Sequence, residues 1–158
     1  MLRRPQQLVR AKPAEVGEPL FPRHLRWLLG LTAAALAMGL AAARWVEPDR
    51  RGFGTHERMG LAPCTFRILF NRPCPSCGMT TAWARAARGQ LGRALRANAG
   101  GALLAVAAIL AVPWLAVSAA LGRWALRLPP GHWIAIGTSV AGIVILMQWL
   151  IRLVSGPG

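Results

Sequence analysis

Acidic residues are scarce in this chain. Its 158 residues include five Asp and Glu against nineteen Lys and Arg. The five acids form no pair of the kind that general acid–base catalysis uses; they are Glu15, Glu18, Glu47, Asp49 and Glu57. The motifs G-x-S-x-G, H-E-x-x-H and G-x-x-x-x-G-K are missing as well. These absences argue against ordinary acid–base or hydrolytic catalysis.

Charged residues of both signs are also few. They make up 15% of the sequence, beside 54% hydrophobic residues, whereas an ordinary soluble domain carries about 25% charged residues. This composition predicts a membrane protein with room for one domain. The net charge of +14 does not predict nucleic-acid binding, because the basic residues lie beside apolar runs and not on one basic face. We expect anionic lipid head groups as their counterpart.

Three long apolar runs without charged residues predict three membrane-spanning helices. The first run, between Arg26 and Arg44, reads WLLGLTAAALAMGLAAA, and with its flanks it extends from Trp27 to Trp45. At 1.5 Å per residue it is about 27 Å long, close to the roughly 30 Å of a hydrocarbon core. We expect spans at residues 26–45, 98–121 and 132–151. Because no charged residue lies inside the runs, a proton relay or an ion path of charged side chains is not expected.

The spans divide the chain into a tail and a membrane domain. Residues 1–24 combine four prolines with mixed charge and no apolar period, which is typical of a flexible basic tail. Residues 25–152 are expected to form a single helical membrane domain, with residues 46–97 as a loop between the first two spans. Eleven basic residues lie on the side of this loop and eight on the other. The positive-inside rule therefore favours a cytoplasmic loop.

The loop contains all three cysteines, in the stretch CTFRILFNRPCPSCGMTTAWARAARGQ. Proline suits the first helical position, so Pro75 predicts a helix with Cys74 before it and Cys77 one turn later, both thiols pointing the same way. Farther along, between Trp83 and Arg96, apolar residues can share one side of a helix while arginines cover much of the rest, as in a helix that lies in the membrane interface. A loop helix packed on its neighbours explains them equally well. Gly89 and Gly92 are expected to divide this helix into two pieces.

The cysteine spacing permits two kinds of chemistry. Cys74 and Cys77 form a C-x-x-C pair, with Cys64 ten positions upstream and His56 eight before that. Together these four residues supply the ligands of a closed zinc site, although a second C-x-x-C knuckle is missing. C-P-S-C also has the spacing of a redox dithiol, but no strand pattern provides the thioredoxin-like setting. Metal binding, thiol redox chemistry and simple packing are the three interpretations.

Three stretches carry a family resemblance: GTHERMGLAPCTF, CPSCGMTTAWARAARGQ and ALRANAGG. They resemble the bacterial membrane family called domain of unknown function 2752, over about residues 52–150. The resemblance implies a small multi-pass protein of the bacterial inner membrane with a helical hairpin after the cysteine loop, and no established activity. The positions that carry the family pattern are Cys64, Cys74, Pro75, Cys77, Gly78, Thr80, Gly89 and Asn98. The family usually has Asn-Pro where this chain has Asn98 and Ala99.

Two functions fit an all-α membrane protein with three transmembrane helices and a cysteine-containing, partly helical interfacial loop between the first and second. In the expected one, a non-catalytic membrane component uses this loop as a cap that binds zinc, a partner membrane protein or lipid head groups. In the alternative, a membrane thiol-disulfide oxidoreductase or metal-handling protein uses Cys74 and Cys77, assisted by Cys64.

Overall fold

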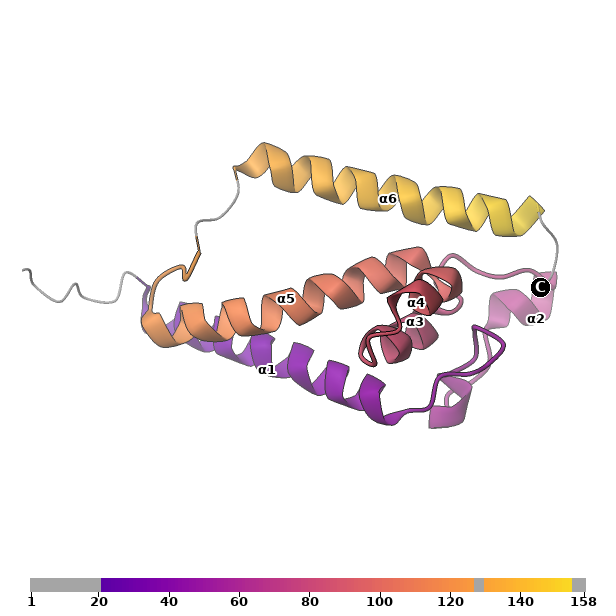
Figure 1. Ribbon diagram of the computed structural model, residues 1–158, viewed down its shortest axis with the longest axis horizontal. Helices are drawn as coiled ribbons and strands as arrows, with labels where there is room; N and C mark the ends of the chain where they lie inside the picture. The colour runs from indigo at the N-terminus through magenta and orange to yellow at the C-terminus, as the bar shows by residue number, and fades with distance from the viewer. Residues whose placement is uncertain (1–20, 127–129, 155–158) are drawn as a thin grey trace, which may run out of the picture.

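Three long helices form the body of the molecule. The computed structural model describes residues 21–126 and 130–154, and these ranges contain helices and no strand. The long helices are α1 (Arg23–Trp45), α5 (Ala99–Leu121) and α6 (Gly131–Val154), each long and apolar enough to cross a membrane. Helix α5 contacts both others, and Figure 1 shows that it runs opposite to each of them. The expected all-α fold with three spans is confirmed, and the chain is a multi-pass membrane protein.

The chain between α1 and α5 is partly helical, as expected. It contains η1 (Glu57–Met59), α2 (Thr65–Phe70), α3 (Met79–Ala86) and α4 (Leu91–Ala97). We call residues 46–97 the cysteine cap. In Figure 1 the cap lies at the end of the molecule where α1 ends, α5 begins and α6 ends. The cysteines and the C-terminal end of α6 therefore share one side of the bundle.

Two glycines determine where the helices of the cap begin and end. Helix α3 begins at Met79 and not at Pro75, so the expected start of this helix is wrong. Gly78 has a φ of +84°, which is outside helical geometry, and the residues before it form a turn. Gly89, with a φ of +74°, separates α3 from α4 as expected. Gly92 lies within α4 and does not interrupt it.

Alanines form the core between α3, α4 and α5. The buried cluster consists of Ala82, Ala86, Ala94, Ala97, Ala102 and Ala105. Trp83 packs against this cluster. Small side chains let helix backbones approach closely, which is how helices associate where lipid replaces water. Large apolar side chains on all three long helices face outward, where a bilayer would cover them.

The expected tail, residues 1–24, is only partly described. Residues 1–20 lie outside the described residues, and α1 already begins at Arg23.

Polar contacts attach α6 to the cysteine cap. No residue of α6 is buried, so apolar packing alone does not hold this helix. The side chain of Gln148 accepts a hydrogen bond from the N–H of Ala99 (2.6 Å) and donates one to the carbonyl of Leu95 (3.0 Å). The indole N–H of Trp149 donates to the carbonyl of Pro73 (3.1 Å). These bonds join the C-terminal half of α6 to the cap.

Arg26 of α1 binds the C-terminal end of α5. Its Nε donates to the carbonyl of Ala119 (2.9 Å), and its Nη2 donates to the carbonyl of Ala120 (3.0 Å). The last carbonyls of a helix lack partners within the helix and carry partial negative charge. The last turn of α5 contains no basic residue of its own. Arg26 therefore supplies the cation that this helix end lacks.

Replacing Arg26 with methionine is expected to lower the melting temperature of the detergent-purified protein. Both hydrogen bonds to α5 are lost, and because the contact is partly exposed we expect a cost of about 1 kcal/mol. Thermal unfolding followed by tryptophan fluorescence measures the change. Arg23→Met is the matched control, because Arg23 is exposed at the start of the same helix. Equal melting temperatures for the two variants would contradict this role of Arg26.

Candidate functional site

The three cysteine thiols lie together in the cysteine cap. The Sγ atoms of Cys64, Cys74 and Cys77 all lie within 4.8 Å of one another, and those of Cys74 and Cys77 are 3.4 Å apart. All three are free thiols; Cys77 is buried and the other two are half-buried. In a tetrahedral zinc site with Zn–S bonds of about 2.3 Å, two sulfurs are about 3.8 Å apart. The thiols are therefore close to the positions that one metal ion requires.

His56, the fourth expected ligand, does not belong to this group. It is half-buried and directly precedes η1, where its carbonyl accepts hydrogen bonds from the N–H groups of Met59 (3.0 Å) and Leu61 (3.2 Å). The structure brings together three of the four expected ligands. Among the described residues, no other His, Cys, Asp or Glu joins the cluster. A metal ion bound by the three thiols would have one coordination position left for another ligand.

The two cysteines of the C-x-x-C pair lie on a hydrogen-bonded turn. The N–H of Cys77 donates to the carbonyl of Cys74 (3.0 Å), which brings both thiols to the same side. Gly78 follows with its φ of +84°, and a Cβ there would lie 2.5 Å from the carbonyl oxygen of Ala97 and 2.7 Å from that of Gly52. Only glycine combines this conformation with this lack of space. The turn therefore requires glycine at position 78.

Asn98 connects the cysteine turn to the start of α5. Its side chain is buried, and its Nδ2 donates to the carbonyls of Pro75 (3.0 Å) and Cys77 (3.1 Å). Its Oδ1 accepts a hydrogen bond from the N–H of Gly101 (2.7 Å), one of the N–H groups that the first turn of a helix leaves without a partner. One amide side chain thus positions both the site and a membrane helix.

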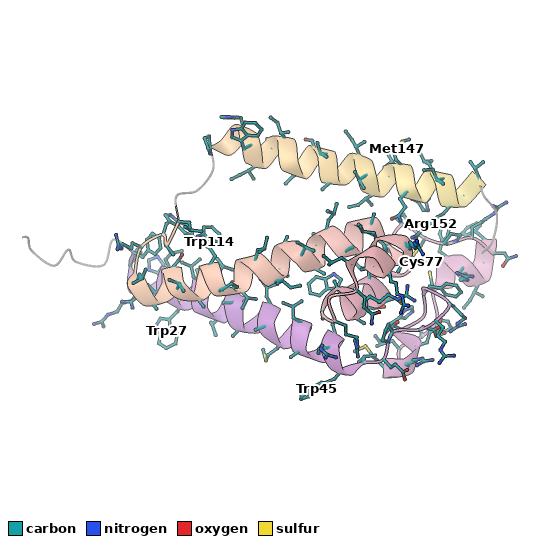
Figure 2. All side chains as sticks on the ribbon, viewed as in Figure 1. Trp27, Trp45, Cys77, Trp114, Met147 and Arg152 are labelled. Atoms are coloured by element: carbon teal, nitrogen blue, oxygen red, sulfur yellow. The ribbon has the colours of Figure 1, made fainter. Side chains whose placement is uncertain are left out.

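Arg152, near the end of α6, places a positive charge beside Cys77. Its Nη1 donates to the carbonyl of Cys77 (3.1 Å), and its Nη2 donates to the carbonyls of Arg96 (3.2 Å) and Ala97. Figure 2 shows Arg152 pointing from α6 toward Cys77. Sequence reasoning did not identify this residue. The available signal was a lone arginine at the end of an apolar run, which is also typical of an interfacial anchor.

The surroundings of the thiols change their acidity in opposite directions. Burial, together with hydrogen bonding to Cys74, raises the pKa of Cys77 from its ordinary value of 9.0 to about 12. Burial also opposes ionisation of Cys64, but the backbone N–H groups of Arg67 and Phe66 and the other two thiols lower its pKa below the ordinary value. Of the three thiols, Cys77 is the one whose ionisation depends most on a nearby cation, and it is the thiol beside Arg152.

A second polar cluster supports the cap from within. The hydroxyls of Thr55 and Thr81 are both buried and lie 2.7 Å apart, and the N–H of Asp49 donates to the Thr55 hydroxyl (3.0 Å). The hydrogen bonds that Asp49 accepts from Arg51 outweigh its burial and lower the pKa of its carboxyl to about 2. Thr81 therefore has a structural role next to the cysteine turn.

Comparison with known proteins supports the family resemblance. The sequence model of a family described as protein of unknown function (DUF2752) matches residues 64–112. This range includes the three cysteines, Gly78 and Asn98, so the resemblance is confirmed over the part of the chain that forms the site. No curated protein and no solved structure matches the chain. The residue after Asn98 is Ala99, and its N–H donates to the side chain of Gln148 (2.6 Å).

Gly78→Ala is expected to destabilise the protein more than Gly60→Ala. Both glycines have positive φ, which costs another residue about 1–2 kcal/mol, but a Cβ at Gly60 meets nothing within 4 Å. At Gly78 the added carbon also collides with two carbonyl oxygens. Thermal unfolding of the two variants in detergent measures the difference. Equal melting temperatures would show that the close approach around Gly78 is not required.

The raised pKa of Cys77 predicts a loss of stability in alkaline, metal-free solution. The unfolded thiol ionises near its ordinary pKa of 9.0, whereas the folded thiol keeps its proton until about 12. The folded state therefore binds this proton more tightly, and its contribution is full below about pH 9 and falls as the pH rises toward 12. Melting temperatures at about pH 8 and about pH 11 with a chelator present measure the fall. Cys77→Ser should remove it, and an unchanged fall in that variant would exclude Cys77 as the source.

Proposed function

We propose that this chain is a non-catalytic membrane component whose cysteine cap is built around a metal ion, with zinc as the preferred ion. The observation that supports this proposal is the convergence of the three Sγ atoms within 4.8 Å. Thiolate ligands favour zinc and other thiophilic ions over magnesium or calcium. The cap has a core of small alanines, and a structural metal adds folding free energy that such a core does not supply.

The charges around the thiols support the same proposal. Three thiolates around a divalent cation leave a net charge of about −1. Metal binding deprotonates a coordinating thiol outright, which would overcome the raised pKa of Cys77. The guanidinium of Arg152 lies beside Cys77 and offsets the remaining negative charge. The end of α6 would thereby contribute to the stability of the metal centre.

His56 is the proposed fourth ligand. Structural zinc sites are closed by four protein ligands, and His56 is the one histidine of the cysteine cap, since His24 and His132 lie elsewhere. It would have to approach the thiols through a rearrangement of the segment around η1. A water molecule, or a ligand from a partner membrane protein, would otherwise complete the coordination.

Thiol–disulfide exchange is the second proposed function. It is favoured by the distance of 3.4 Å between the Sγ atoms of Cys74 and Cys77. In this reaction a partner's disulfide accepts two electrons and two protons; its S–S bond breaks into two thiols while an S–S bond forms between Cys74 and Cys77. The burial and raised pKa of Cys77 disfavour its thiolate, which is why the metal-bound cap is preferred.

The proposed location is the inner membrane of a bacterium, with residues 25–152 as one membrane domain. The cysteine cap would face the cytoplasm and contact anionic lipid head groups. Two arguments support this orientation. Basic residues are more numerous on the side of the cap, and a cytoplasm keeps thiols reduced and therefore available to a metal ion.

Metal analysis beside a free-thiol count tests the metal centre. Detergent-purified protein loaded with zinc is expected to hold about one ion per chain against a competing chelator and to protect its thiols from alkylation. Replacing any of the three cysteines with serine should abolish most of this retention and lower the melting temperature, because a thiolate ligand is lost. A protein that retains no metal, and whose Cys74 and Cys77 oxidise reversibly, would refute the metal centre and support the alternative.

A matched pair of variants tests whether His56 is the fourth ligand. His56→Ala should lower zinc retention at least tenfold if His56 coordinates the ion, since one of four ligands is lost. His132→Ala, on α6 and outside the cap, should leave retention unchanged. Equal retention in the two variants would exclude His56 and leave the three cysteines as the protein's ligands.

A further inference from the structure

An apolar cavity of about 370 Å³ lies where α1, α3 and α5 meet. Its walls come from the last two turns of α1, residues 79–84 of α3, Leu104 of α5, and Val46, Thr55 and Met59 of the cap. Gly39 leaves part of it unfilled, because a Cβ there would meet nothing within 4 Å. The volume falls within the range of about 300–1,000 Å³ that is usual for ligand sites.

A second cavity, of about 280 Å³, is basic. Its charged residues are Arg50, Arg85, Arg88, Arg93 and Glu47. The carboxylate of Glu47 is largely exposed and pairs with Arg58 at 3.6 Å. Within the described parts of the chain, none of the four arginines forms an ion pair. The cavity therefore carries an excess of positive charge that attracts an anion.

The two cavities adjoin at Arg88. Its Nη1 donates to the carbonyls of Ala43 (3.0 Å) and Ala84 (2.7 Å), and both alanines line the apolar cavity. In two segments of the chain the lining changes between neighbouring residues. Val46 and Ala84 line the apolar cavity, whereas the residues that follow them, Glu47 and Arg85, line the second cavity. An apolar cavity and a cationic cavity are therefore neighbours on either side of Arg88.

This site is oriented as a lipid in the adjacent leaflet would be. From Gly39 to Val46 the apolar lining extends about 10 Å along α1, toward the middle of the span. The basic cavity lies beyond the end of α1. Trp45 is 87% exposed at the same end of the helix (Figure 2), at the level where an indole meets the membrane interface. The arginines thus lie at head-group level and the apolar cavity at acyl-chain level.

We propose that this two-part site binds one anionic phospholipid of the surrounding bilayer. The arginines hold its phosphate, because guanidinium groups form paired hydrogen bonds with phosphate oxygens. The apolar cavity holds the first part of one acyl chain. The bound lipid fills the space between α1 and α3 and links the cysteine cap to the first span. This inference deepens the proposed contact with anionic head groups and is independent of the metal centre.

Native mass spectrometry with phosphatidylglycerol and with phosphatidylcholine of the same acyl chains tests the head-group end. One phosphatidylglycerol per chain should bind more tightly than phosphatidylcholine. The double variant Arg50→Gln/Arg93→Gln should weaken phosphatidylglycerol binding about 10- to 30-fold. Arg96→Gln/Arg123→Gln removes the same charge outside the site and is the matched control. Equal weakening in both variants, or equal binding of both lipids, would show that the lipid is held only by general surface attraction. Either result would overturn the site.

Filling the cavity tests the acyl-chain end. Gly39→Leu should lower phosphatidylglycerol binding about tenfold, because the leucine occupies the cavity. Gly142→Leu on α6 is the control, since a Cβ there also meets nothing within 4 Å. The Gly39 variant should not melt at a lower temperature than the control. Unchanged lipid binding in Gly39→Leu, or full competition by glycerol phosphate without acyl chains, would overturn this part of the site.

Zinc retention measured in the same samples separates the two proposals. The Arg50→Gln/Arg93→Gln and Gly39→Leu variants should keep the zinc of the unaltered protein, since they lie outside the cysteine cluster. Lipid binding that is lost while zinc is retained supports the lipid site whether or not the metal has a structural role. Simultaneous loss of lipid and zinc would show that these variants disturb the whole cap, and would overturn the site as a separate feature.

Discussion

The cysteine cap and the membrane bundle both depend on the hydrogen bonds of the Asn98 side chain. Its amide donates to two carbonyls of the cysteine turn, and its oxygen accepts from the start of α5. A turn and a helix end both leave backbone groups without regular partners, and such groups are costly where water is scarce. Because one buried side chain satisfies three of them, the position of the thiols and the start of α5 are determined together.

Polar groups also explain how α6 is attached. Association of apolar helices in lipid gains little from burial, since the lipid tails are as apolar as the side chains. Helix α6 accordingly has no buried residue but joins the cap through Gln148, Trp149 and Arg152. The contact of Arg152 also bears on the chemistry of the site, because its positively charged guanidinium donates to the carbonyl of Cys77. The third helix and the proposed metal centre are therefore coupled through a side chain that reaches from one to the other.

Several features of the site follow from short-range patterns, and others do not. The C-x-x-C spacing predicted that Cys74 and Cys77 lie on one side, and the structure places their sulfurs 3.4 Å apart. The predicted start of α3 at Pro75 was wrong. Proline suits a first helical position, but the positive φ of Gly78 prevents a continuous helix from Pro75 into α3. Gly78 also lies so close to the carbonyls of Ala97 and Gly52 that a Cβ would collide with both, and no local pattern contains this contact.

The sequence by itself determined the three spans and the helical class, because transfer of an apolar run into a membrane depends on the length and the residues of that run and not on distant contacts. Only the tertiary structure decided that Cys64 joins the other two thiols, that His56 lies apart from them, and that Arg152 contacts Cys77. These arrangements depend on hydrogen bonds and close approaches between residues far apart in the chain. Periodicity and spacing along the sequence suggested candidate partners, but they do not decide which of these contacts form.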